Sequence, residues 1–199
     1  MKYTKRLIFI IALSFLTACS QPTGTVDDPG PLGYGFENNA NFYENNSYPD
    51  RKEYDYLFDR AVVRAGLVDE LKDRNKEFTV FLPDLPFLEE ELKKQGVSAE
   101  QFLASPNLEV FVKSHIIEGK WLELYDLWRS DGQTFTSMAG TSITVRTETV
   151  IAEGEATNKI FVNDVEVFTY QFSPRAPRPE PFGTTNGVLQ FIEGLLVKP

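Results

Sequence analysis

Residues 78–87 have the sequence Phe-Thr-Val-Phe-Leu-Pro-Asp-Leu-Pro-Phe. The first five side chains are aromatic, β-branched or aliphatic, which is typical of a buried strand, and Pro83 ends the pattern because proline has no N–H to donate. A helix is expected to follow over residues 87–94. At the end of the chain, the apolar run from Gly187 to Val197 predicts one last buried strand with a kink at Gly194.

Helical patterns surround the first strand, and strand patterns follow them. Helices are predicted over residues 54–65, 67–71, 98–104 and 108–116. The third of these is opened by a capping box of Ser98 and Gln101. After Gly119, β-branched and aromatic runs predict strands at residues 134–138, 141–149, 159–162 and 166–172. Helices followed by strands indicate an α+β fold rather than alternating strands and helices.

Four short motifs occur in the order found in fasciclin (FAS1) domains. Residues 79–87 resemble the family's Thr-Val-Phe-Ala-Pro motif and its following Phe, and residues 186–196 resemble its Asn-Gly-Val-(Ile/Val)-His-X-Ile-Asp motif before a closing Leu-Leu. Residues 114–119 are similar to Tyr-His-(Val/Ile)-X-X-Gly, and residues 65–67 to the Ala-Gly-Leu after the first helix. The resemblance covers about residues 54–199. The family-motif residues are Thr79, Phe81, Pro83, Phe87, His115, Gly119, Asn186 and Gly187.

The resemblance implies a FAS1-like β-sandwich wedge covered by short α-helices, most often used outside the cell for adhesion and for contacts with matrix or glycans. Such domains usually occur in tandem. Here there is one copy, so avidity would come from many anchored molecules on one surface. Two positions and one segment depart from the family pattern. Gln190 stands where His is common, Ser114 stands where Tyr or Phe is common, and residues 175–185 form a Pro/Arg segment where the family has a shorter acidic stretch. Ligand-binding properties of the second motif or of the loop before it are therefore not expected from the resemblance.

Residues 1–18 have the layout of a signal peptide. Basic residues precede an apolar run of 12 residues at positions 7–18, which is shorter than the roughly 20 needed for a helix to span a bilayer. Leu16-Thr17-Ala18-Cys19 resembles the lipobox of bacterial lipoproteins, in which the Cys thiol receives a diacylglyceryl group. Cys19 is therefore the predicted lipid attachment site, and the membrane is a partner through this anchor. The expected location is the bacterial cell envelope, with the outer membrane favoured and the leaflet left open.

Residues 19–49 are interpreted as a lipidated acidic tether to a single domain at residues 50–199. Pro, Gly and Asn are frequent here, and no Lys or Arg occurs between positions 7 and 50. Aromatic residues are unusual in a flexible linker, and the later ones are expected to pack on the domain or on a partner. The aromatic residues of this segment are Tyr34, Phe36, Phe42, Tyr43 and Tyr48.

Charge and composition argue against several classes of function. Lys and Arg total 20 and Asp and Glu total 29, a formal net charge of −9, so no nucleic acid is expected as a partner. One Cys and one His cannot form an intrachain disulfide or a Cys/His zinc site. No nucleophile elbow, phosphate loop or metalloprotease motif occurs, so the chain is predicted to be no enzyme and to hold no metal and no cofactor.

His115, on an apolar stripe, is interpreted as a hydrogen-bonded core histidine.

Two segments are candidates for an interaction surface, and their residues are Trp121, Tyr125, Trp128, Arg175 and Arg178. The three aromatic residues are spaced to share one helical face with Leu124. This face is either core or an exposed platform for sugars or a partner. The two arginines lie in a proline-rich segment, residues 173–185, which is interpreted as an exposed loop.

Together these features favour a non-enzymatic, membrane-anchored adhesion or interaction module with a protein or glycan partner on the cell surface or in the envelope. One alternative is a lipoprotein that captures a glycan or small molecule for a neighbouring uptake system. A hydrolase acting through paired carboxylates is a minor alternative, because such a pair leaves no signature in a sequence.

Overall fold

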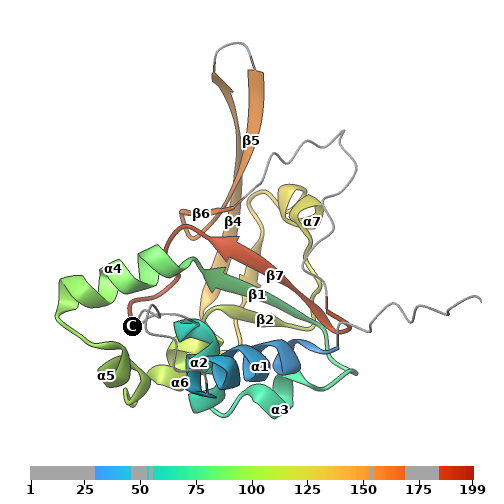
Figure 1. Cartoon of the computed structure of the whole chain (residues 1–199). Helices are drawn as coiled ribbons and strands as arrows, with labels where there is room; N and C mark the ends of the chain where they lie inside the picture. Colours follow the sequence, from blue (N-terminus) through green and yellow to red (C-terminus); the bar gives the residue numbers. More distant parts are fainter. Residues whose placement is uncertain (1–29, 46–52, 54–55, 153–154, 169–183) are drawn as a thin grey trace, which may run out of the picture.

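The computed structural model describes residues 30–45, 53, 56–152, 155–168 and 184–199. Its helices are α1 (Leu32–Asn45), α2 (Leu57–Arg64), α3 (Val68–Leu71), α4 (Leu85–Gln95), α5 (Ala99–Leu103), α6 (Leu108–Lys113) and α7 (Leu124–Trp128). Its strands are β1 (Phe78–Pro83), β2 (Ile116–Glu118), β3 (Thr134–Thr136), β4 (Ser142–Ala152), β5 (Glu155–Val162), β6 (Val165–Val167) and β7 (Gly187–Ile192). Helices α1, α2, α3, α5 and α6 gather on one side of β1 and β2 (Figure 1).

The strands form one seven-stranded sheet in the order β2-β1-β7-β6-β5-β4-β3. β1 and β7 are parallel neighbours, beginning with Phe78 opposite Gly187, and the other neighbouring pairs are antiparallel. The two edge strands approach each other, because the N–H of Met138, after β3, donates to the carbonyl of Ile116 in β2 at 2.8 Å. The sheet is thus mixed and nearly closed. With the short helices around it, this architecture confirms the expected α+β wedge.

Alternation along the central strands divides the apolar side chains between two cores. Phe78 and Val80 of β1 lie in a first core with residues from α1 to α6. Phe81 points to the opposite face, into a second core that it shares with strands β4 to β7 and with Leu127 of α7. Since side chains of a strand point alternately to its two faces, β1 stabilises both cores at once.

Most predicted elements are present close to their expected bounds. The two motifs form the adjacent strands β1 and β7, and the helices before and after β1 follow the predicted order. The capping box of α5 is confirmed: the N–H of Gln101 donates to Ser98 Oγ at 3.2 Å, and the N–H of Ser98 donates to Gln101 Oε1 at 2.9 Å. The long β4–β5 hairpin projects from the body of the domain (Figure 1).

The segment interpreted as a tether, residues 19–49, contains a helix in its second half. α1 packs on the domain through Leu32, Phe36 and Ala40, which are at most 3% exposed. Their spacing of four places them on one helical face, a pattern that the Pro, Gly and Asn content of the segment obscured. Gly33 allows a close approach, because a Cβ there would lie 2.4 Å from the carbonyl oxygen of Val68. The described fold therefore includes α1, while residues 19–29 lie outside the described residues, as does the predicted signal peptide.

Two further boundaries differ from the prediction. Ile116 belongs to strand β2 instead of the preceding helix, because it pairs with Val80 of β1, and this tertiary pairing overrides the local helical period. The last strand ends at Ile192 rather than continuing to Val197, and the next pairing contact is the N–H of Glu193 with the carbonyl of Glu166 (2.8 Å). No helix within the described ranges is both long and apolar enough to cross a membrane.

Candidate functional site

Asn186 and Gly187 join β7 to the helical layer. The Asn186 amide is buried; its Oδ1 accepts from the N–H of Leu32 (2.9 Å), and its Nδ2 donates to the carbonyls of Leu71 (2.9 Å) and Asp73 (3.1 Å). At Gly187 a Cβ would lie 2.5 Å from a methyl carbon of Leu32 and from the carbonyl oxygen of Phe78. These motif residues thus hold α1, the end of α3 and the central strands together.

The first motif is also largely structural. Thr79 is buried, and its hydroxyl donates to the carbonyl of Lys120 (2.8 Å) and accepts from the N–H of Leu122 (2.9 Å). Phe81 is fully buried and Pro83 is buried at the end of β1. Phe87 is different, since 36% of its surface is exposed on α4. Among the motif residues of this strand and helix, Phe87 is the one with an exposed side chain.

His115 is buried with both ring nitrogens hydrogen-bonded. Nδ1 lies 2.9 Å from the carbonyl of Phe111, and Nε2 accepts from the N–H of Leu196 at 3.2 Å. Burial lowers the pKa of His115 to about 4, so the imidazole is neutral at physiological pH. The interpretation as a satisfied core histidine is confirmed. Gly119, with φ of 76°, forms the turn after β2, and its N–H donates to the backbone carbonyl of Glu77 at 2.7 Å.

The two positions that depart from the family pattern also serve the fold. Gln190 is 5% exposed, and its Nε2 donates to the carbonyl of Leu122 at 2.8 Å. Ser114 is buried, and its hydroxyl donates to the carbonyl of Val110 at 2.8 Å. Both polar side chains therefore satisfy backbone groups inside the domain.

A polar recess of about 460 Å³ lies at the amino ends of β1 and β7. Its walls include Arg74, Lys76, Glu118, Trp121, Thr185 and Asn186. The Lys76 ammonium binds Glu70 (3.0 Å) and Glu118 (2.8 Å), and these hydrogen bonds raise the pKa of Lys76. The half-buried indole of Trp121 thus lies beside charged groups and beside Thr185, the last residue of the proline-rich segment.

The predicted aromatic face is only partly correct. Trp121 precedes α7, because the helix begins after Glu123, whose N–H donates to the carboxylate of Asp126 (3.1 Å). Trp128 packs against the second core, and Tyr125 is half-buried with the guanidinium of Arg129 5.6 Å from its ring centre. The three residues therefore form no single platform. The two arginines of the predicted surface, Arg175 and Arg178, lie outside the described residues.

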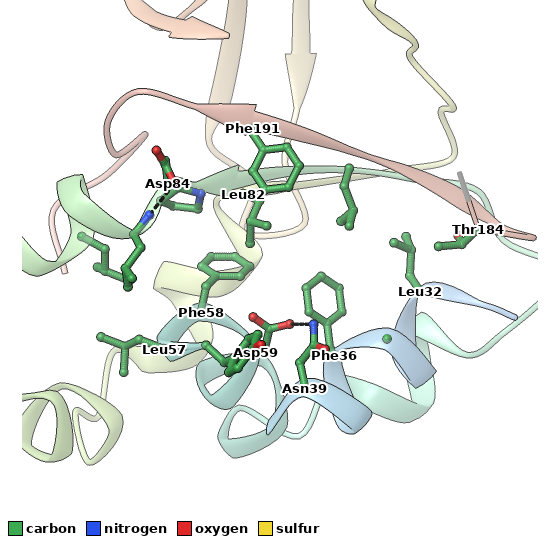
Figure 2. A pocket seen from close by; sticks show the side chains of 16 residues that line it. Leu32, Phe36, Asn39, Leu57, Phe58, Asp59, Leu82, Asp84, Thr184 and Phe191 are labelled. Carbon is green, nitrogen blue, oxygen red and sulfur yellow. Dashed lines mark hydrogen bonds between the residues drawn. The ribbon is translucent and has the colours of Figure 1, made fainter. Parts of the chain in front are cut away.

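An apolar cleft of about 610 Å³ lies at the opposite, carboxyl ends of β1 and β7, between these strands and helices α1, α2 and α4. Asp59 of α2, which is 8% exposed, and Asn39 of α1 face each other on its helical wall (Figure 2). Asn39 Nδ2 donates to Asp59 Oδ1 at 2.8 Å. Neither residue carries a sequence signal of a binding site, because an Asp on an amphipathic helix is usually exposed to solvent.

Comparison with protein families decides the class of the domain, since the fasciclin domain model matches residues 57–198. This chain belongs to the fasciclin family. A similar solved structure is entitled "Novel Fold Revealed by the Structure of a FAS1 Domain Pair from the Insect Cell Adhesion Molecule Fasciclin I", with a TM-score of 0.52 and 18% identity. The match covers 74% of this chain and 48% of that one, so this chain spans about half of its length. The search of curated proteins found no match.

A fasciclin domain is a cell-adhesion-type module, which supports a non-enzymatic role in interaction. In this fasciclin domain most motif residues stabilise the fold, and the solvent-accessible features of the described residues include the recess at Trp121, the cleft at Asp59 and the exposed ring of Phe87. Within the ranges that the structure covers, no three His, Cys, Asp or Glu side chains are grouped to hold a metal ion.

Proposed function

We propose that this fasciclin domain is the binding module of a lipid-anchored protein of the bacterial cell envelope. The proposal for the anchor rests on the sequence, in which Cys19 follows a short apolar run and a lipobox-like segment. Two or more acyl chains hold a protein stably on a membrane, which leaves the domain available to a partner. The partner is a macromolecule of the cell surface, the matrix or the envelope.

The observation that carries this proposal is the recess at Trp121. Its half-buried indole is bordered by the cationic side chains of Arg74 and Lys76 and by the carboxylate of Glu118. Trp and Arg are enriched among residues that contribute most to binding, and polar groups around an aromatic ring give orientation. Arg175 and Arg178 precede Thr185 of the recess in sequence and are proposed to extend the same surface.

The proposal is tested with the full-length chain immobilised on beads and exposed to intact cells and to matrix proteins. Trp121→Ala and the double variant Arg175→Ala/Arg178→Ala are expected to reduce binding about tenfold or more. Phe87→Ala is the matched control, because it removes an exposed aromatic ring at the other end of the strands. Unchanged binding by folded Trp121→Ala and double-arginine variants would contradict the role of this surface.

Capture of a glycan is a second candidate function, favoured by the size and chemistry of the recess. A volume of about 460 Å³ lies within the usual range for a small ligand, and an indole beside hydrogen-bonding groups suits a sugar ring. The chain has two tryptophans, so Trp128→Phe leaves Trp121 as the single reporter and Trp121→Phe leaves Trp128. Titration with an oligosaccharide should change the fluorescence of the first variant and not of the second. Equal changes in both, or none across a broad panel, would exclude capture at this recess.

A further inference from the structure

The apolar cleft exists because the helices cover only part of the sheet face that they pack on. Residues opposite each other in parallel strands share a face, so Val80 with Leu189 and Leu82 with Phe191 form successive rows. Val80 is fully buried, whereas Leu82, Leu189 and Phe191 remain half-exposed at the carboxyl ends of β1 and β7. The helices therefore leave an open apolar surface at this end.

Side chains from α1, α2 and the start of α4 form the opposite wall. Phe36 and Phe58 are buried and face the cleft, and Leu82 and Phe191 project toward them from the strands (Figure 2). The buried side chain of Leu88 also lines the cleft. A volume of about 610 Å³ is typical of a pocket for a small organic molecule. Apolar walls of this kind favour a ligand with an apolar body.

Asp59 places a carboxyl group in this apolar wall. Its side chain is bonded to Asn39, and within the described ranges no cation is paired with it. Desolvation raises the pKa of Asp59 to about 6, so the group is mostly ionised at neutral pH although its surroundings disfavour the charge. The neighbouring Arg60 is engaged elsewhere, with the carboxylate of Glu100 and with the carbonyl of Glu53 (3.1 Å).

The described lining of the cleft is negative. Of the 16 described residues that line it, none is Lys, Arg or His, and the two with carboxyl groups are Asp59 and Asp84. Asp84 sits at the start of α4, where it accepts from the N–H of Leu85 at 2.9 Å. An ammonium group close to Asp59 would offset the cost of its buried charge, while an anion would be repelled by both carboxylates.

We propose that this cleft binds a small molecule with an apolar body and a protonated amine, and that the amine donates hydrogen bonds to Asp59. Asn39 is the positioning residue, because its amide holds the carboxyl group toward the cleft. The apolar body lies between Phe36 and Phe58 on one side and Leu82 and Phe191 on the other. This site is separate from the recess at Trp121, and the inference is independent of the binding proposed there.

Three matched probes test the proposal: 4-phenylbutylamine, 4-phenyl-1-butanol and 4-phenylbutyrate. They share one apolar body and differ in the charge of the end group. Calorimetric titration of the unmodified full-length chain at about pH 7.5, well above the pKa of Asp59, is expected to show one amine per chain. The amine should bind about tenfold more tightly than the alcohol, and the carboxylate more weakly than both.

The Asp59→Asn variant distinguishes the effect of the carboxylate charge on binding from the effect of the shape of the cleft, because Asn has nearly the same size without the charge. It is expected to weaken binding of the amine about tenfold while leaving the affinity for the alcohol within about twofold. Asp69→Asn is the control, since Asp69 is exposed on α3 and the substitution removes the same charge. Thermal melting establishes that both variants are folded.

Equal affinities for the three probes, or no binding of the amine at millimolar concentration, would overturn the proposal on the unmodified chain alone. An equal loss of amine and alcohol binding in a folded Asp59→Asn variant would also overturn it, because the carboxyl group would then act through structure and not through its charge.

Discussion

Nε2 of His115 accepts a hydrogen bond from the backbone N–H of Leu196, 81 positions later in the chain. Nδ1 of the same ring lies 2.9 Å from the carbonyl of Phe111, which fixes the tautomer with the proton on Nδ1. The ring also contacts Phe58 and Phe111, with centroids 5.6 and 4.7 Å away. One imidazole therefore connects the end of α6, the helix α2 and the C-terminal segment.

Lowering the pH should reduce the stability of the folded domain through His115. Burial lowers its pKa from 6.5 to about 4, so the folded state resists a proton that the unfolded state binds. The stabilising effect of the neutral ring is present above about pH 6.5 and is lost as the pH falls toward 4, by on the order of 3 kcal/mol. Urea unfolding should show that His115→Gln is less stable than wild type at neutral pH. This difference in the free energy of unfolding should decrease as the pH falls from 6.5 toward 4. A penalty that does not change with pH would contradict this role.

Asp59 should have the opposite pH dependence. Its pKa is raised from 3.8 to about 6, so its contribution is most favourable below about pH 4 and is lost as the pH rises through 6. Asp59→Asn should therefore gain stability relative to wild type as the pH rises, by on the order of 3 kcal/mol at neutral pH. Asp69→Asn, on an exposed position, should show little change. A difference curve for Asp59→Asn that is flat from pH 4 to 7 would show that this carboxyl group carries no burial penalty.

Asn186 should be among the costliest side chains to truncate. Asn186→Ala removes four hydrogen bonds, one of them a long bond from the hydroxyl of Thr184 (3.4 Å), and leaves the buried N–H of Leu32 and the carbonyl of Leu71 without this partner. We expect a loss of about 2–4 kcal/mol in the free energy of unfolding, measured by urea denaturation. Asn107→Ala, an exposed position before α6 with no side-chain cap bond, should cost less than about 0.5 kcal/mol. Equal losses for the two variants would refute the role of Asn186 in docking α1.

Cys19→Ser should release the protein from the membrane. If the thiol carries the anchor, the variant loses both the acyl groups and cleavage at the lipobox, and membrane pellets should be depleted of mature lipidated protein. Ser20→Ala, which retains the thiol, is the control. Mass spectrometry of the purified protein measures the acyl groups directly. An unmodified thiol in wild type would remove the anchor from the proposal.

Helices and strands with a clear local sequence pattern were predicted well from the sequence. β1 and β7 combine β-branched and aromatic runs with clear ends, and the capping box of α5 is a local signal. α1 was missed because the burial of Leu32 and Phe36 depends on a docking contact at Gly33 and on Asn186, which lies 154 positions from Leu32. Such long-range contacts cannot be predicted from the amino-acid composition of the segment that forms α1.

The candidate sites were harder to predict than the strands. Trp121 was recognised as a candidate, but its recess is assembled from residues 74–77, 118, 119, 121 and 185–186, which only the sheet brings together. In the sequence Asp59 has the pattern of an ordinary surface charge of α2, and its burial depends on the packing of α1 beside it. Both sites depend on the arrangement of separate segments at the two ends of β1 and β7.

Binding at the recess beside Trp121 is tested most directly on an array of oligosaccharides and matrix proteins probed with the full-length chain, Trp121→Ala and Phe87→Ala. We expect the wild type and Phe87→Ala to bind the same members of the array, and Trp121→Ala to bind them about tenfold or more weakly. Binding that is undiminished in Trp121→Ala, or the absence of any bound member, would contradict an interaction module that works through this recess.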